Sequence, residues 1–442
     1  MTIPRIVIAG THSGCGKTTV AGGLMGALVA KGYRVQPFKV GPDFIDPSHH
    51  SRICGRESRN LDPFMMGETG CRDTFLRASE TSDVAIIEGV MGMFDGVDGT
   101  DLASTAHVAR ILQAPVILVV DAKGMSRSIH ALIRGFREFD PTVSIAGVIV
   151  NRTGSPRHRA MIEPFLALPA LGWLPRSDEI AVKSRHLGLV MGHEPAPHRE
   201  IAALIAEHCN LDAIILAARA APPLPATAHA DIKVAPGSRI GIAYDKAFCF
   251  YYRDNLDLLE RSGAELVFFS ALTDHLPSVD AVYIGGGYPE LFLPNLASAS
   301  CTMELKKAAG DNLPILGECG GLMYLARDVL GEANHRMTGI LPASATMTKR
   351  VQALGYTKGT ITSKGAGFLT PGQTITGHEF HYSQLDPDRD ARFTITLSRG
   401  KGIFNGRDGL VSLNALGQYT HAYFSPEFAR CFVDAAVSFS RT

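Results

Sequence analysis

The chain has 442 residues, about three times the commonest domain length, so we expect two or three domains. Its 45% hydrophobic and 19% charged residues exclude a largely disordered chain. Lys plus Arg and Asp plus Glu both total 43, and this zero net charge argues against a dedicated nucleic-acid binder. No apolar run is long enough to span a membrane, and the N-terminal MTIPRIVIAG lacks the features of a signal peptide. We therefore expect a cytoplasmic protein whose eight cysteines are mostly free thiols.

The first half of the chain alternates buried β-rich runs with segments of helical period. Strands are predicted at Ile3–Ala9, Val35–Val40, Val84–Ile87, Val116–Val120 and Ile145–Val150. Helices are predicted at Lys17–Ala30 and Ser126–Phe136. Because the strands are nearly continuous in apolar residues, this alternation predicts an α/β domain with a parallel sheet covered on both faces.

A glycine-rich segment, GTHSGCGKTT, follows the first predicted strand and opens the first helix. Glycines let backbone N–H groups surround phosphate oxygens, a lysine binds the β- and γ-phosphates, and a hydroxyl binds Mg²⁺. Thr11 stands where the strict P-loop pattern has its first glycine, and this longer form resembles the loop of dethiobiotin synthetase. The segment predicts an ATP site made by Gly14, Gly16, Lys17, Thr18 and Thr19. Thr18 is also a predicted Mg²⁺ ligand.

Three further segments end in polar side chains near that nucleotide. One predicted strand ends in Glu88, a carboxylate that can bind Mg²⁺. The segment FKVGPDFIDP presents Lys39 and then Asp43 and Asp46 after a Gly-Pro turn. A cation beside acids suits the activation of an anionic acceptor, whereas a surface salt bridge is the plainer alternative. The amide of Asn151, at the end of a later strand, can bond adenine or merely cap a turn.

The composition changes in the middle of the chain. Residues 219–237 are rich in Ala and Pro without helical or strand period, which predicts a linker between domains 1–218 and 238–442. After the linker, strands are again predicted at Arg239–Ala243, Glu265–Phe269, Ala281–Ile284 and Pro314–Leu316. The second domain is therefore also expected to be α/β.

The second domain contains a pattern typical of a nucleophile elbow. Small residues flank Cys319 in GECGG, as a sharp strand-to-helix turn requires. We expect the thiol to lie at a helix N-terminus, which would lower its pKa. The GGGY run offers the backbone N–H of Gly287, beside that of Gly320, to a developing oxyanion. His421, near the end of the chain, is the expected base.

Together these segments strongly resemble the cobyrinate a,c-diamide synthase family, which includes hydrogenobyrinate and nickel-sirohydrochlorin a,c-diamide synthases. The matching stretches run in family order and are GTHSGCGKTT, FKVGPDFIDP, EGVMGMFDG, SRHLGL, GGGYPE, GECGGLMYL and GHEFHYS. The resemblance implies a dethiobiotin-synthetase-like P-loop domain followed by a class I glutamine amidotransferase domain. It also implies amidation of the a- and c-acetates of a tetrapyrrole through an acyl phosphate, in cobalamin or coenzyme F430 biosynthesis and hence methanogenesis.

The resemblance also assigns residues and partners. Lys17, Thr18 and Glu88 belong to the ATP–Mg²⁺ site by this comparison. The acceptor carboxylate is expected to meet the γ-phosphate at Lys39, Asp43, Asp46 and Asp95. Asp43 is also an expected Mg²⁺ ligand by this resemblance. The expected partners are the tetrapyrrole, glutamine and ATP, without nucleic acid or membrane, and we also consider a homodimer.

The sequence departs from the usual glutaminase pattern after the base. Many class I glutaminases carry a Glu two residues after the catalytic His, but here that residue is Tyr423. Glu427 is then a candidate to orient His421. The roles of His378, Glu379 and His381 stay open between glutamine and tetrapyrrole, and the adjacent histidines 49 and 50 make a poor metal site.

The sequence leaves two alternative functions to consider. A nucleotide switch of the partitioning-ATPase type usually has an extra lysine early in its P-loop, and residues 10–14 contain none. A cobyric acid synthase amidates other corrin side chains, and its segments match FKVGPDFIDP and EGVMGMFDG less well. The choice between a corrin and nickel-sirohydrochlorin is not settled by these motifs.

Overall fold

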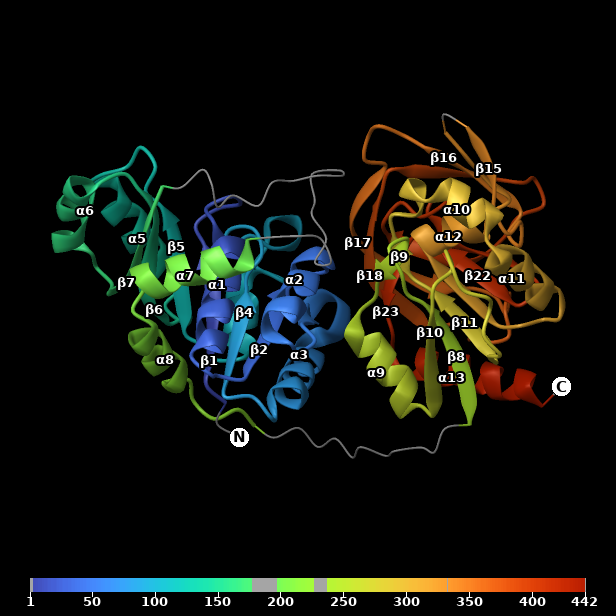
Figure 1. The fold of residues 1–442 in the computed structure, drawn as a ribbon, viewed down its shortest axis with the longest axis horizontal. Helices are drawn as coiled ribbons and strands as arrows, with labels where there is room; N and C mark the ends of the chain where they lie inside the picture. Colours follow the sequence, from blue (N-terminus) through green and yellow to red (C-terminus); the bar gives the residue numbers. More distant parts are fainter. Residues whose placement is uncertain (1–2, 177–196, 226–236, 332, 442) are drawn as a thin grey trace. The chain divides into compact units, whose positions relative to one another are not determined.

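The computed structural model describes residues 3–176, 197–225, 237–331 and 333–441, which fall into two compact units, Met1–His229 and Ala230–Thr442 (Figure 1). The division falls within the predicted linker. The first residues of that segment pack on the first unit, where Leu224 is buried and Arg5 donates a 2.6 Å hydrogen bond to the carbonyl of Pro222. The SRHLGL segment lies outside the described residues, as does most of the predicted linker.

The first unit is built on a parallel sheet, seven-stranded in its described residues, in the order β3-β2-β4-β1-β5-β6-β7. The strands are β1 (Arg5–Gly10), β2 (Val35–Val40), β3 (Arg59–Leu61), β4 (Val84–Glu88), β5 (Val116–Asp121), β6 (Ile145–Thr153) and β7 (Ala170–Pro175). The helices are α1 (Lys17–Ala30), α2 (Ile45–Cys54), α3 (Pro63–Ser79), α4 (Thr105–Ile111), α5 (Ser128–Phe139), α6 (Pro156–Ile162), α7 (His198–His208) and α8 (Leu211–Arg219), with short 3₁₀ turns at Val97–Gly99 and Glu163–Phe165.

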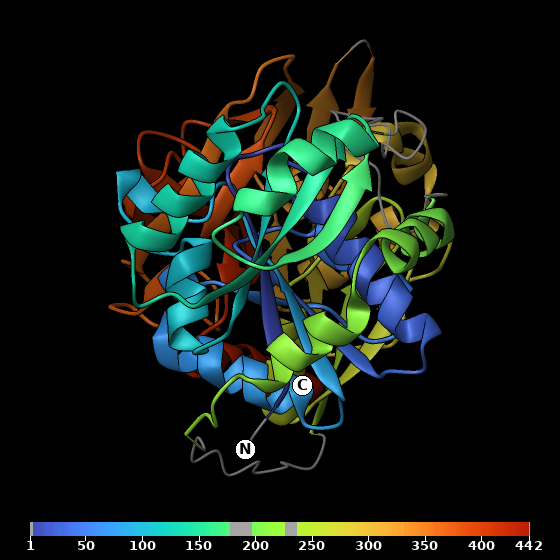
Figure 2. The same cartoon turned by 90° about the vertical axis from the view of Figure 1, so that its left-hand side faces the viewer.

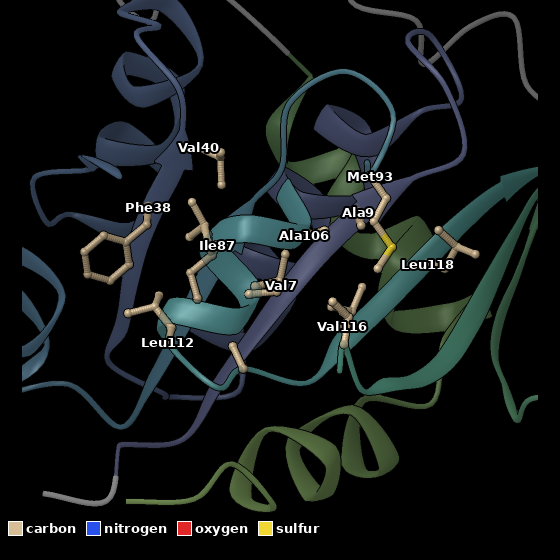
Figure 3. Close-up of a cluster of buried hydrophobic side chains, with 14 of the residues drawn as sticks. Val7, Ala9, Phe38, Val40, Ile87, Met93, Ala106, Leu112, Val116 and Leu118 are labelled. Carbon is tan, nitrogen blue, oxygen red and sulfur yellow. The ribbon is translucent and has the colours of Figure 1, made fainter. Parts of the chain in front are cut away.

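Helices cover both faces of this sheet, as Figures 1 and 2 show. Alternate residues of each strand point into opposite cores. On β1, Val7 and Ala9 enter one core (Figure 3), whereas Ile6 and Ile8 enter the other. The first core includes residues of α3, α4 and α5, and the second includes residues of α1, α7 and α8. Burial on both faces explains why these strands are apolar throughout.

The second unit has a mixed sheet, with ten strands among the described residues, in the order β10-β8-β11-β13-β22-β21-β20-β17-β18-β23. The parallel half contains β8 (Ser238–Ala243), β10 (Ala264–Phe269), β11 (Ala281–Ile284), β13 (Ile315–Glu318) and β22 (Ala415–Gln418). The antiparallel half contains β17 (Ala353–Ile361), β18 (Thr374–His381), β20 (Arg392–Arg399), β21 (Arg407–Ser412) and β23 (His421–Tyr423).

Smaller elements complete the second unit. Two short sheets contain β9 (Phe248–Phe250) with β12 (Gly286–Gly287), and β14 (Asp328–Leu330), β15 (Asn334–Arg336), β16 (Ala343–Met347) and β19 (Ser383–Pro387). The helices are α9 (Arg253–Arg261), α10 (Leu293–Ser298), α11 (Ser300–Gly310), α12 (Gly320–Leu325) and α13 (Pro426–Ser440), with a 3₁₀ turn at Pro289–Leu291.

The predicted elements are present, with ends shifted by a few residues. Helix α1 has the predicted bounds and β4 ends at Glu88, as its motif predicts, whereas β13 runs two residues further than predicted and includes Glu318. The α/β class is confirmed for both units, and all eight cysteines are free thiols. The antiparallel half of the second sheet was not predicted. No helix in the described ranges has both the length and the apolar character that a membrane crossing requires.

Candidate active sites

The P-loop joins β1 to α1 and has the backbone that glycine permits. Gly14 and Gly16 have φ angles of 82° and 103°, in the left-handed region where other residues are strained. Gly10 has no room for a side chain, because an added Cβ would lie 2.4 Å from the Sγ atom of Cys15. Cys15 is fully buried and belongs to the hydrophobic core that includes residues of α1.

The polar side chains of the loop have defined contacts. The Lys17 ammonium donates to the carbonyl of His12 at 3.3 Å. The hydroxyl of Thr18, an exposed residue, donates to Glu88 Oε1 at 2.6 Å. Asn151 donates from Nδ2 to the carbonyl of Cys15 at 2.9 Å, so its amide braces the P-loop. Adenine binding by that amide stays a prediction.

Glu88 is the centre of a buried ionic cluster at the end of β4. Its Oε1 lies 2.9 Å from the Lys39 ammonium, which also donates to Asp46 Oδ2 at 2.6 Å. Its Oε2 lies 2.7 Å from His50 Nε2. Although burial opposes it, the charge of Lys39 and the contact with His50 lower the pKa of Glu88. The charges of Asp46 and Glu88 likewise outweigh burial and raise the pKa of Lys39, which therefore stays charged.

Asp43 lies at the edge of this cluster, with Oδ2 at 3.9 Å from the Lys39 ammonium. Its Oδ1 accepts the N–H of Ile45 at 2.8 Å. Burial and the Asp46 carboxylate raise the pKa of Asp43 to about 8. Asn60 donates to the carbonyls of Gly41 and Asp43 at 2.8 and 2.7 Å, which fixes the Gly-Pro turn that presents the acids.

Asp95 approaches the P-loop from the loop after β4. Its carboxylate is exposed and accepts the N–H of Gly92 at 2.9 Å. Met93, which follows Gly92 in the chain, donates its N–H to the carbonyl of Gly10 at 2.8 Å. The structure therefore brings Asp95, the P-loop and Glu88 to the same end of the sheet.

The donors at this end of the sheet fit Mg²⁺. The hydroxyl of Thr18 and the carboxylate of Glu88 are adjacent oxygen donors, which Mg²⁺ prefers. In the described part of the chain, no three His, Cys, Asp or Glu side chains form a group that could hold a metal ion. A Mg²⁺ ion there would take its remaining ligands from nucleotide oxygens and water.

In the second unit, Cys319 occupies the sharp turn between β13 and α12. Its φ and ψ angles are 48° and −95°, a strained conformation for a residue with a side chain. An added Cβ on Gly321 would lie 2.2 Å from the carbonyl oxygen of Ile284, so the turn requires a glycine there. The predicted nucleophile elbow is present.

The expected lowering of the Cys319 pKa is wrong. Cys319 is 8% exposed, and its Sγ donates to the carbonyl of Phe380 at 3.8 Å. Burial raises the pKa of Cys319 to about 12, and the contact with the N–H of Gly320 offsets only part of that effect. Helix α12 has six residues, too few to stabilise a thiolate against this burial. Burial therefore favours the neutral thiol of Cys319, the predicted nucleophile.

The oxyanion donors and the base lie beside one another. An added Cβ on Gly320 would lie 3.2 Å from the backbone nitrogen of Gly287, so the two predicted N–H donors are neighbours. An added Cβ on Gly286 would lie 2.3 Å from Cε1 of His421. The glycine run therefore allows His421 to pack directly against the strand that supplies an oxyanion donor.

His421, the predicted base, is buried, 2% exposed at the start of β23. Its ring stacks on that of His378 in β18, with centroids 4.9 Å apart and planes at 17°. Burial lowers the pKa of His421 well below its usual range. The hydroxyl of Tyr423 donates to Asp254 at 3.2 Å, and Glu427 is exposed in the first turn of α13. This exposure gives no support to Glu427 as the group that orients His421.

Comparison with known proteins assigns each half of the chain to a domain family. Residues 6–189 match a CobQ/CobB/MinD/ParA nucleotide binding domain, and residues 239–428 match a CobB/CobQ-like glutamine amidotransferase domain. The cobyrinate a,c-diamide synthase of Methanosarcina barkeri is 43% identical over 479 residues, covering 99% of this chain and 97% of that protein. Those of Archaeoglobus fulgidus (42% over 453 residues; 99% and 98%) and Magnetococcus marinus (41% over 449 residues; 97% and 96%) are similarly close.

This chain belongs to the cobyrinate a,c-diamide synthase family. It is therefore an enzyme, a ligase that takes nitrogen from glutamine, and its first domain binds nucleotide. A purely nucleotide-driven switch is ruled out. Both sites described above lie within the matched domains of this a,c-diamide synthase family member.

Two contacts in this family member were not anticipated from the sequence. His50 lies against Glu88, although no sequence motif assigned His50 a role. Glu318, the residue before the nucleophile, is 1% exposed and makes three hydrogen bonds. A sequence signal existed for Glu318, because an acidic residue inside a glycine-rich buried turn needs a partner.

Proposed function

We propose that this chain converts the a- and c-acetate carboxylates of cobyrinate to amides, using ATP, Mg²⁺ and glutamine in the cytoplasm. One observation carries the proposal: a single chain combines a P-loop and its ionic cluster with a complete nucleophile elbow, in a family whose members bear that name. The first site activates a carboxylate and the second supplies ammonia, and both are needed to make an amide from glutamine.

In the first domain, a substrate carboxylate attacks the γ-phosphate of ATP, which forms an acyl phosphate and releases ADP. This step turns a poor leaving oxygen into a good one, and it depends mainly on positioning and charge. Mg²⁺ held by Thr18 and Glu88 would neutralise phosphate charge. The permanently charged Lys39, held between Asp46 and Glu88, is placed to orient the incoming carboxylate, and Lys17 binds the phosphates.

In the second domain, the proton of Cys319 moves to His421 as the sulfur attacks the amide carbon of glutamine. Burial, which raises the pKa of Cys319 and lowers that of His421, favours a transfer coupled to the attack. The N–H groups of Gly287 and Gly320 receive the oxyanion. His421 returns its proton to the leaving nitrogen, ammonia departs, and water hydrolyses the glutamyl thioester to glutamate. The ammonia then displaces phosphate from the acyl phosphate.

The test uses the purified full chain with ATP, Mg²⁺ and glutamine. Cobyrinate and nickel-sirohydrochlorin, which carry the same pair of acetate arms, are offered separately, and mass spectrometry counts the amides added. We expect two amides on cobyrinate, and the ratio of kcat/KM values decides which macrocycle is preferred. More than two amides would indicate a cobyric acid synthase, and none on either macrocycle would reject the proposal.

A further inference from the structure

The side chain of Glu318 is a buried junction in the second unit. It lies at the end of β13, directly before Cys319. Its Oε2 accepts the hydroxyl proton of Tyr283 at 2.7 Å. Its Oε1 accepts the N–H of Ala422 at 3.0 Å and an amide proton of Gln418 at 3.3 Å. All of these groups are buried, so water does not replace a lost partner.

These three donors come from separate strands that build the glutaminase site. Tyr283 belongs to β11, which leads directly into the Gly285–Gly287 run that supplies an oxyanion donor. Ala422 follows His421 on β23. One carboxylate therefore contacts the segments that carry the oxyanion donor, the nucleophile and the base.

The contact with Ala422 is one that the backbone ladder does not provide. In the sheet order, β13 lies between β11 and β22, whereas β23 pairs with β18 at the far edge. No ladder hydrogen bond joins β13 to β23, although Cys319 donates its N–H to the carbonyl of Gln418 at 2.8 Å, three residues before His421. The side chain of Glu318 makes that connection directly.

We propose that Glu318 is a positioning residue that fixes the backbone of His421 relative to Cys319 during glutamine hydrolysis. The inference rests on the proposed roles of Cys319 and His421. A displacement of about 1 Å between a base and a nucleophile reduces rate about 10²-fold, so a single restraint of this kind is enough to matter. Position 423, where related glutaminases orient the base with a Glu, holds a Tyr bonded to Asp254 instead.

Two substitutions separate this role from simple loss of charge. Glu318→Gln keeps an oxygen for the N–H of Ala422 and offers an amide to Tyr283, whose hydroxyl rotates to accept. Because burial already raises the pKa of Glu318 to about 8, an uncharged group of the same shape is acceptable at this position. Glu318→Met has similar volume and no strong acceptor, so three buried donors lose their partner.

We expect Glu318→Met to lower kcat for glutamine-dependent amidation about 10²-fold, while KM for glutamine and ammonia-dependent amidation stay near wild type. Glu318→Gln should restore the glutamine-dependent rate. Thr394→Val is the control for loss of a buried hydrogen bond, because the Thr394 hydroxyl donates to Gly409 at 3.0 Å on strands away from the elbow. That variant should change the melting temperature without separating the two nitrogen sources.

Three results would overturn the inference: full glutamine-dependent activity in Glu318→Met, equal loss with glutamine and ammonia in a folded Glu318→Met protein, or a Gln variant as slow as the Met variant. If the Met variant does not fold, Tyr283→Phe decides, because it removes one donor only. It should slow the glutamine-dependent reaction alone, and wild-type kinetics would reject the role. Cys319→Ala is run beside them: persisting use of glutamine there rejects the proposed function itself.

Discussion

The hydroxyl of Thr18 donates to Glu88 Oε1 across 2.6 Å, although 70 residues separate them in the chain. The contact joins the start of α1 to the end of β4, which neighbours β1 in the sheet. It holds two oxygen donors together beside the phosphate-binding loop. The same carboxylate also contacts Lys39, so the proposed metal donors and the cation proposed to orient the acceptor form one connected cluster.

This site should be required for every amidation, whatever the nitrogen source. Lys17→Ala removes a cation from the phosphates, and Glu88→Gln weakens Mg²⁺ binding. We expect both variants to lose amidation with glutamine and with ammonia, while basal glutamine hydrolysis continues, since Cys319 lies in the other domain. Measuring amide product and glutamate separately checks this. Lys31→Ala, at the residue after the end of α1, removes an exposed ion pair with Asp212 in α8 and is the matched control. Full amidation by Lys17→Ala would show that ATP binds elsewhere.

His50 should matter through Glu88. Removing its ring frees Oε2 of Glu88, so the carboxylate is less firmly oriented toward Thr18 and Lys39. Loss of a group that orients a metal ligand commonly costs about 10- to 100-fold in metal affinity or activity, and we expect His50→Ala to weaken Mg²⁺-dependent nucleotide binding within that range. Calorimetric titration of ATP with and without Mg²⁺ measures it. The control is His49→Ala, because Nδ1 of the neighbouring His49 lies 3.3 Å from Nε2 of His198. Equal losses of nucleotide binding in both variants would contradict a specific role for His50.

Most parallel strands of both units were predictable because they are buried on both faces, whereas β3, β7 and β22 were not predicted. Strands buried on both faces are continuous apolar runs, as in VAIIE, and this signal is local. The antiparallel half was missed because its strands contain no continuous apolar run. Strand β17, ALGYTKGTI, alternates weakly between exposed and buried residues and contains two glycines, so its sequence does not stand out from a loop.

The elbow was predictable for a different reason. Its turn requires glycines at fixed positions, and that steric demand is visible in GECGG. The pKa of Cys319 was not predictable, because it depends on burial by segments far away in sequence, including Phe380 on β18. The contact of Ala422 with Glu318 likewise depends on how the sheet curves, which no local pattern encodes.

A single activation site should serve both amidations. The sequence holds one P-loop and one acceptor segment, so the macrocycle must leave or turn between the two reactions. We expect a monoamide to accumulate early and then to disappear. Rapid-quench sampling with mass spectrometry follows it. A time course that holds only substrate and diamide at every point would replace free release with reorientation inside the site.

Alkylation of Cys319 should keep rising with pH. Burial raises the pKa of this thiol to about 12, which favours the neutral form, so the thiolate fraction grows about tenfold for each pH unit below that value. We expect the second-order rate with iodoacetamide to increase through the whole range from about pH 6 to about pH 10. Mass spectrometry of the labelled peptide measures it, and Cys319→Ala corrects for the other thiols. A plateau near neutral pH would show that the thiolate is stabilised before glutamine binds.

The nitrogen source should separate the two domains. Cys319→Ala removes the nucleophile but little volume, and the neighbouring glycines preserve the turn. Glutamine-dependent amidation should fall to background, whereas ammonium at high concentration and raised pH still supports amidation, because free NH₃ is the reacting form. His421→Ala should show nearly the same loss with glutamine, since a thiol of raised pKa needs a base to take its proton. Product amide is measured with each nitrogen source in both variants. Near wild-type use of glutamine by Cys319→Ala would place the nucleophile elsewhere.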